Sequence, residues 1–267
     1  MINLKEYISE SILDVDDNID NVDKNIKDQI KQFLNDNFDK AFLYKISDKP
    51  NADGKYEVSS SNNITVENKK ITSLTNKSFI WTTVDGDFDC SDCKSLKSLE
   101  GAPKEVENFS CTNCTSLKSL EGAPKEVGGS FFCKYCNLIT SLEGAPKEVG
   151  GSFNCSDCKS LTSLKGAPEK VCGGFSCSDC NSLKSLEGAP KEVRKDFHCR
   201  CCNSLKSLQG APKEVGGNFS CTNCTSLKSL EGASKEVYGD FLCSYCGIKF
   251  TTDDVKKVSN VKGNIIV

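Results

Sequence analysis

The sequence predicts a mainly β solenoid of about ten turns, with stacked parallel strands and a small α/β cap at the N-terminal end. Three observations predict this fold: a unit of 22 residues recurs along most of the chain, degenerate copies flank it, and the first segment has a helical periodicity instead. A repeat this short cannot bury its own apolar face, so neighbouring copies must build one continuous core.

Residues 1–60 form the predicted cap. Apolar residues recur at spacings of three and four over 15–38, which predicts an amphipathic helix. They are Val15, Ile19, Val22, Ile26, Ile30, Phe33, Leu34 and Phe38. Phe42, Tyr44 and Ile46 then alternate as in a strand. We expect this segment to cover the first open edge of the solenoid, and a docking module for a partner or a particle is the alternative.

The repeats occupy residues 61–267. Clean units over 88–246 share the pattern F-x-C-x-x-C-x-S-L-x-S-L-x-G-A-P-x-x-V-x-x-x. They start at Phe88, Phe109, Phe131, Phe153, Phe175, Phe197, Phe219 and Phe241. Degenerate repeats over 61–87 and 247–267 are expected to close the two ends, as atypical terminal repeats do in other solenoids.

Each part of the unit has an expected local structure. Phe and the first Cys are two residues apart and share one strand face, and the degenerate end repeats place Val66 and Val267 at that Cys position, so the face points inward. The second Cys follows a tight two-residue bend, and the two Leu suit an irregular or 3₁₀-like arc. Gly-Ala-Pro ends regular structure, and Gly-Gly turns the chain into the next strand.

The repeat also carries a family resemblance. Its frame V/L-x-x-x-F-x-C-x-x-C-x-x-L-x-x-L-x-x-x-P, seen as VGGSFNCSDCKSLTSLKGAP at 149–168, resembles the leucine-rich repeat, in the variant with Cys instead of Asn after the strand. The sequence S-L-x-S-L-E-G-A-P-K-E-V-G-G within the repeat resembles the repeats of bacterial and tailed-phage leucine-rich-repeat proteins. The resemblance covers roughly residues 60–267 and implies a right-handed leucine-rich-repeat-like solenoid. The chain departs from the family where Cys replaces Leu, Ile or Val at the inward strand position.

Stacking turns the CxxC pairs into two parallel columns of thiols, for which two interpretations stand. The pairs are Cys90/Cys93, Cys111/Cys114, Cys133/Cys136, Cys155/Cys158, Cys177/Cys180, Cys199/Cys202, Cys221/Cys224 and Cys243/Cys246. In the first interpretation both columns are core, since cysteine is a small and well-buried residue. The family resemblance implies that the second column then forms hydrogen bonds that hold the loop after the strand.

In the second interpretation all sixteen of these cysteines are metal ligands. The two cysteines occur together or not at all, and choosing Cys over a larger apolar residue loses roughly 0.8 kcal/mol of burial per unit. Two CxxC clips make a four-thiolate site for zinc or an iron–sulfur cluster. Turns about 4.8 Å apart favour the larger [4Fe-4S] core over tetrahedral zinc. We take this second interpretation as the working prediction: a non-enzymatic solenoid that holds a row of iron–sulfur clusters, which would suit electron storage or transfer. The alternative is a leucine-rich-repeat binding or structural scaffold with reduced core cysteines and no metal. CxxC disulfides are not expected because they are strained.

Two cysteines and the single histidine lie outside these columns. Cys172 replaces a turn glycine and Cys201 lies between Cys199 and Cys202, so we expect both to be exposed free thiols. A capping-ligand role for Cys201 is the alternative. His198 lies on the outward side of its strand, where we expect a solvated imidazole.

Composition and motifs exclude several classes of function. A formal net charge of −3 does not indicate a basic surface for binding nucleic acid or an anionic membrane. There is no apolar run of membrane-spanning length and no secretory pattern at the start, so we expect a cytoplasmic protein with reduced thiols. One histidine and no catalytic motif argue against an enzyme. The remaining recognition surface is the outward strand face, which with the cap could bind a protein partner. The residues of this face are Asp89, Ser110, Phe132, Asn154, Ser176, His198, Ser220 and Leu242.

Overall fold

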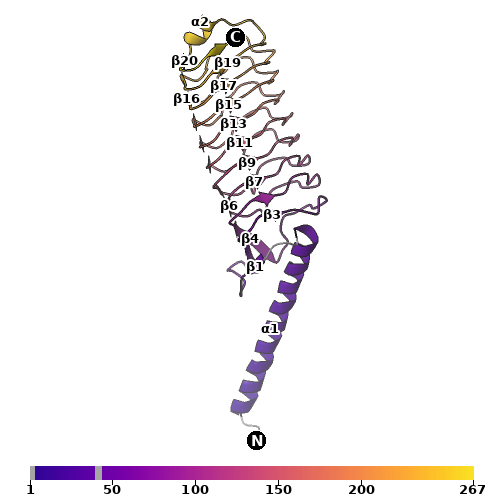
Figure 1. The fold of residues 1–267 in the computed structure, drawn as a ribbon. Coiled ribbons are helices and arrows are strands. Elements are labelled where there is room, and N and C mark those ends of the chain that lie inside the picture. The colour runs from indigo at the N-terminus through magenta and orange to yellow at the C-terminus, as the bar shows by residue number, and fades with distance from the viewer. Residues whose placement is uncertain (1–3, 40–43) are drawn as a thin grey trace.

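The computed structural model describes residues 4–39 and 44–267, with side chains from residue 21 onward. It is an elongated solenoid of about ten turns whose strands stack in parallel along one axis, with one long helix at the N-terminal end (Figure 1). The predicted fold class is therefore confirmed.

Each turn contributes two short strands, and these build two separate sheets. The sheet that starts each repeat, here called the Phe ladder, has ten strands. They are β3 (Ile64–Thr65), β5 (Phe88–Asp89), β7 (Phe109–Ser110), β9 (Phe131–Phe132), β11 (Phe153–Asn154), β13 (Phe175–Ser176), β15 (Phe197–His198), β17 (Phe219–Ser220), β19 (Phe241–Leu242) and β21 (Ile265–Ile266). Equivalent residues of successive turns face each other in register, as Phe153 faces Phe175.

The second sheet, here called the Val ladder, has eleven strands. They are β1 (Tyr44–Ile46), β2 (Tyr56–Ser60), β4 (Phe79–Val84), β6 (Glu105–Val106), β8 (Glu126–Val127), β10 (Glu148–Val149), β12 (Lys170–Val171), β14 (Glu192–Val193), β16 (Glu214–Val215), β18 (Glu236–Val237) and β20 (Asn260–Val261). Only β1 runs antiparallel to its neighbour. The sequence predicts the Phe ladder, where Phe and the first Cys mark an inward face, but not this second sheet, because most of its strands contribute a single inward Val beside an exposed charged residue.

The core consists of columns of identical side chains that run along the axis. The Phe rings of neighbouring turns stack with centroids 4.9–5.8 Å apart, from Phe88 to Phe241. The strand spacing of about 4.8 Å sets this separation, and it lies in the range that favours aromatic pairs. The leucine and first-cysteine columns are buried beside the rings.

Two backbone features close each turn as the motif predicts. The residue directly before the second Cys has a left-handed backbone in every clean repeat, with φ of 56–63°. The glycine of Gly-Ala-Pro has φ of 86–93°, and Gly232 in the variant Gly-Ala-Ser has φ of 81°. At Gly144 a Cβ atom would also collide with the backbone of Leu120 and Glu121 in the preceding turn. Glycine is needed there because only it tolerates both the conformation and the close approach.

The N-terminal helix is longer than predicted. Helix α1 spans Leu4–Asn37, and its C-terminal part packs against the first turns while the rest extends away from them (Figure 1). Of the predicted stripe, Ile30, Leu34 and Phe38 are buried, and Val22 is exposed. The side chains of Val15 and Ile19, and all of Phe42, lie outside the described residues.

The helix end is joined to the solenoid by its backbone as well as by its side chains. Phe38 forms an antiparallel bridge with Val66 of the first turn, and the Glu67 amide donates to the Asn37 carbonyl at 2.9 Å. The ring of Phe38 lies 6.1 Å from that of Phe88, at the start of the aromatic column. Contacts of this kind cover the first edge of the stack.

The C-terminal turn contains the short helix α2 (Thr252–Lys256), which begins with a capping box between Thr251 and Asp254. Strands β20 and β21 then complete the last turn in register with the preceding one. Within the described part of the chain, no helix combines the length and the apolar character that crossing a membrane requires.

Candidate functional site

The CxxC cysteines form two columns inside the solenoid. The first column follows the strands of the Phe ladder, and the second follows the left-handed residue of each turn. All sixteen are free thiols, and all are buried except Cys246, which is partly exposed. The sequence therefore places these residues correctly in the core, and their chemistry depends on what each sulfur contacts.

The second-column thiols hold successive turns together. In seven consecutive turns this thiol donates a hydrogen bond to the carbonyl of the first Cys in the preceding turn, with Sγ–O distances of 3.1–3.3 Å. The donor–acceptor pairs are Cys114–Cys90, Cys136–Cys111, Cys158–Cys133, Cys180–Cys155, Cys202–Cys177, Cys224–Cys199 and Cys246–Cys221. The remaining one, Cys93, donates within its own loop to the Ser91 carbonyl at 3.8 Å.

The first-column thiols are surrounded differently. Cys155 donates to the Ser176 carbonyl at 3.4 Å, and several others contact the second-column sulfur of the next turn. For Cys90 and Cys177 this sulfur contact and then burial raise the pKa well above that of a free thiol. For Cys133 burial is the largest cause of the raised pKa. These thiols are therefore neutral at pH 7.

This arrangement can be compared with the needs of a four-thiolate metal site. A metal ligand must be a thiolate, whereas the second-column sulfurs use their protons to bond main-chain carbonyls. Among residues 21–39 and 44–267, no group of three or more His, Cys, Asp or Glu side chains is placed to hold a metal ion. In the structure the second-column sulfurs lie within hydrogen-bond distance of main-chain carbonyls, a contact that a metal-bound thiolate would have to give up.

The two unpaired cysteines are both partly exposed. Cys201 occupies the left-handed position of its turn, with φ of 56°, where neighbouring repeats have Asp179 and Asn223. Cys201 is therefore a turn residue and does not belong to either cysteine column. Cys172 lies in a hollow beside Gly128 and Gly150 of the preceding turns.

His198 is less solvated than the sequence predicts. Its side chain is 26% exposed and lies in a hollow of about 240 Å³, with Nε2 3.9 Å from Oδ2 of Asp196. Burial, followed by the charge of Arg200, lowers the pKa of the imidazole. The hollow coincides with a turn where Arg194 and Lys195 replace the usual Gly-Gly, which is the signal that sequence reasoning missed.

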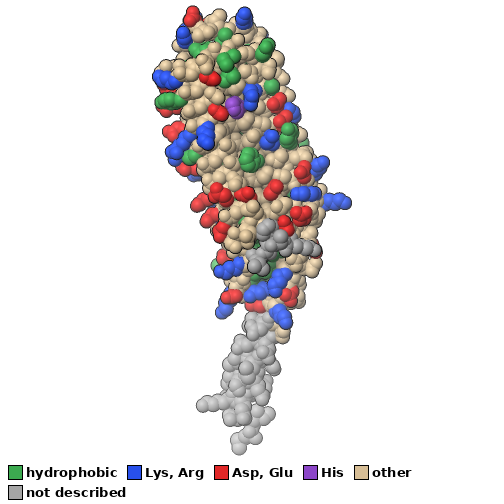
Figure 2. All heavy atoms as spheres, in the orientation of Figure 1, with side chains coloured by type: hydrophobic (Ala, Val, Ile, Leu, Met, Phe, Trp, Pro, Cys, Tyr) green, Lys and Arg blue, Asp and Glu red, His purple; other side chains and the backbone are tan. Residues whose placement is uncertain are grey.

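The outer surface carries interspersed charges. Figure 2 shows basic and acidic side chains scattered over one face, with His198, the single histidine, among them. Ion pairs such as Lys191–Glu169 at 3.2 Å and Lys165–Glu143 at 2.8 Å link neighbouring turns and are solvent-exposed. Such pairs favour solubility and contribute little to stability.

Comparison with protein-family models, curated proteins and solved structures found no match to this chain.

Proposed function

We propose that this protein is a non-enzymatic repeat scaffold whose interior cysteines are reduced, metal-free thiols and whose outward strand face binds a protein partner. The observation that carries the proposal is the series of seven thiol-to-carbonyl hydrogen bonds between successive turns. Each bond satisfies a buried backbone carbonyl and requires a protonated sulfur. The occurrence of the second Cys at each turn of the series is then explained by this structural role.

The face offered to a partner is regular and mostly polar, although Ser220, which the sequence places on it, is buried. Its residues stand in register along the Phe ladder, so small side chains such as Ser176 alternate with larger ones such as Phe132 and Leu242 over a rigid stack. Rigid repeats of this kind lose little conformational entropy when a partner binds. The resemblance to leucine-rich-repeat proteins, including phage-encoded ones, and a cytoplasmic location belong to the same proposal.

Metal binding is the second candidate function. The observation in its favour is that both cysteines occur in each of the clean repeats and neither occurs in the degenerate ends. Sulfur atoms of neighbouring turns also contact each other, as those of Cys90 and Cys114 do. Iron–sulfur clusters or zinc would have to replace the thiol-to-carbonyl bonds, and the thiol protons would be released on binding.

One measurement separates the two candidates. Protein expressed with added iron and purified without oxygen is analysed for iron, zinc and acid-labile sulfide, and its thiols are titrated after denaturation without reductant. The scaffold proposal expects no bound metal and all 18 cysteines as free thiols. Iron and sulfide in multiples that match four-cysteine sites would overturn it in favour of a cluster-binding protein.

A matched variant pair makes the result independent of overall folding. Replacing Cys155 and Cys158 together by serine removes one complete pair, whereas replacing Cys172 and Cys201 removes two thiols outside the columns. A metal-binding protein loses metal in the first variant and keeps it in the second. A scaffold shows no metal in either, and only the first variant is destabilised.

A further inference from the structure

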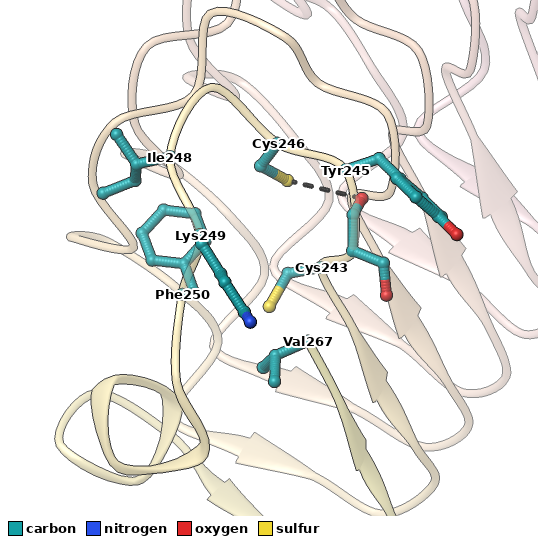
Figure 3. A pocket seen from close by; sticks show the side chains of 8 residues that line it. Cys243, Tyr245, Cys246, Ile248, Lys249, Phe250 and Val267 are labelled. Atoms are coloured by element: carbon teal, nitrogen blue, oxygen red, sulfur yellow. Dashed lines mark hydrogen bonds between the residues drawn. The ribbon is translucent and has the colours of Figure 1, made fainter.

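The C-terminal end of the cysteine columns opens to solvent. A hollow of about 340 Å³ lies there, lined by Cys243 and Cys246 together with Lys249, Phe250 and Val267, with Val267 next to Cys243 (Figure 3). Equivalent cysteines in the interior turns are covered by the next turn. This end is therefore the place where a small solute can reach the columns.

Cys246 is the accessible member of its column. The other second-column cysteines are fully buried, whereas Cys246 is partly exposed and lines the hollow. Its neighbour Tyr245 is 82% exposed, so the loop that carries both residues projects from the stack. A thiol reacts only if the reagent can reach it, and burial prevents this for the cysteines of the interior turns.

A second thiol lies directly behind Cys246. Cys221, in the preceding turn, is fully buried, and its carbonyl accepts a hydrogen bond from the Cys246 thiol with an Sγ–O distance of 3.3 Å. The two side chains are themselves in hydrogen-bond contact. An exposed thiol is thus backed by a buried one at contact distance, which is the arrangement of a reactive and a resolving cysteine.

We propose that Cys246 and Cys221 are an oxidation-sensitive thiol pair, in which a small hydroperoxide reacts at Cys246 and Cys221 converts the product to a disulfide between adjacent turns. This goes beyond a scaffold role and concerns the metal-free protein.

The proposed oxidation takes place in two steps. In the first, the Cys246 sulfur attacks the peroxide, the O–O bond breaks, an S–O bond forms, and the alcohol or water that leaves takes the thiol proton. In the second, the Cys221 sulfur attacks the sulfenic acid, the S–S bond forms, and the hydroxyl leaves as water with the Cys221 proton. Two thiols supply two electrons, and one peroxide accepts them.

The interior offers a matched control. Cys155 and Cys180 make the same contact between adjacent turns, with an Sγ–O distance of 3.3 Å, but both are fully buried. If access decides the reaction, this interior pair stays reduced while the terminal pair is oxidised. If contact alone decides it, both pairs react alike.

The experiment uses the full metal-free chain with Cys172→Ser and Cys201→Asn, which remove the two other partly exposed thiols. After hydrogen peroxide treatment and alkylation, trypsin cleaves after Lys213, Lys228, Lys235 and Lys249. Cys221 and Cys246 then lie on separate peptides, 214–228 and 236–249, and non-reducing mass spectrometry detects their cross-link. Peptides 148–159 and 171–184 report on the interior pair in the same digest.

The expected result is a cross-link between peptides 214–228 and 236–249 that forms at least about tenfold faster than the interior one. Cys221→Ser should abolish it and leave a sulfenic acid on Cys246 that a 1,3-dione traps, and Cys243→Ser should preserve it. Equal rates at the two pairs, a cross-link that survives Cys221→Ser, or a disulfide between Cys243 and Cys246 would each overturn the proposal. The primary readout needs no variant of the pair, so impaired folding of a serine variant cannot hide the answer.

Discussion

The two cysteine columns lie side by side in the same core, yet their sulfur atoms have different surroundings. Second-column thiols donate to main-chain carbonyls of the preceding turn in seven successive turns. In the first column, Cys155 makes a thiol-to-carbonyl bond, with an Sγ–O distance of 3.4 Å. The first column fills space as a small apolar residue would, and Val66 occupies its position in the first turn, where it is also buried.

Residue type and spacing alone therefore do not determine the role of a buried cysteine. One column satisfies backbone acceptors, and the other is buried in the core next to the second-column sulfurs. Substitutions in the second column should therefore remove a polar interaction, whereas those in the first should change mainly volume.

The largest expected effect comes from alkaline pH, which acts on many thiols at once. Burial raises the pKa of Cys93 and of Cys243 to about 12, and raises that of Cys133 as well. The unfolded chain, with thiol pKa values of about 8.5, then loses protons first. The contribution of these three thiols to the free energy of unfolding should therefore be fully present below about pH 8.5 and fall above it, by up to about 1.4 kcal/mol per pH unit for each of them.

Urea titrations between pH 7 and pH 10, under anaerobic reducing conditions, measure this slope. A variant with valine at several first-column positions serves as the control, and its slope should be shallower. Stability that stays constant to pH 10 would contradict the neutral-thiol description of the columns.

The next largest effect is expected for Cys158→Ala. This change removes the thiol that donates to the Cys133 carbonyl at 3.2 Å and leaves a small cavity. The expected loss is about 2 kcal/mol in the free energy of unfolding. Cys158→Ser keeps a donor and should lose less than Cys158→Ala in the same urea titration. Equal losses for the two variants would show that the hydrogen bond contributes nothing.

A smaller effect is expected for Cys177→Val in the first column. Valine adds apolar surface at a position where Val66 is already accommodated, so the free energy of unfolding should change by less than about 1 kcal/mol. The matched variant is Cys202→Val, which removes the donor to the Cys177 carbonyl. Thermal melting of both variants tests the difference, and a greater loss for Cys177→Val would reverse the assignment of the columns.

The smallest effect is expected for a cysteine outside both columns. Cys172 is partly exposed in a surface turn, so Cys172→Ser should change the free energy of unfolding by no more than about 0.5 kcal/mol. A melting temperature well below that of the unmodified chain would mean that this thiol has a structural partner after all.

The sequence predicts the architecture well because the fold depends on a repeated apolar pattern. The Phe, Leu and first-Cys columns follow from the period alone, and Val66 identifies the inward face. The Val ladder is missed because a strand such as Glu148–Val149 offers one buried Val next to an exposed Glu, whereas each Phe-ladder strand of the clean repeats is marked by Phe and a Cys two residues apart. Its existence depends on parallel neighbours rather than on local sequence.

The candidate site is predicted less completely. Spacing places Cys158 in the core, but its acceptor is the Cys133 carbonyl, a backbone atom of another turn that no side-chain pattern marks. The paired occurrence of the cysteines fits metal ligands equally well. Only the position of each sulfur relative to a main-chain carbonyl distinguishes a hydrogen-bond donor from a metal ligand. His198 is misjudged for a similar reason, because the hollow around it depends on the neighbouring turn.

The stacked Phe column also affects how the protein responds to a pulling force. Turns are joined mainly to their immediate neighbours, by ring stacking and by hydrogen bonds along the axis, so a load applied to the two ends passes through every junction in series. Each junction that opens frees a turn of 22 residues, on the order of 70 Å of extended chain. In single-molecule pulling we expect evenly spaced extension steps, so that the protein lengthens as a tether of similar links before any one link is lost completely.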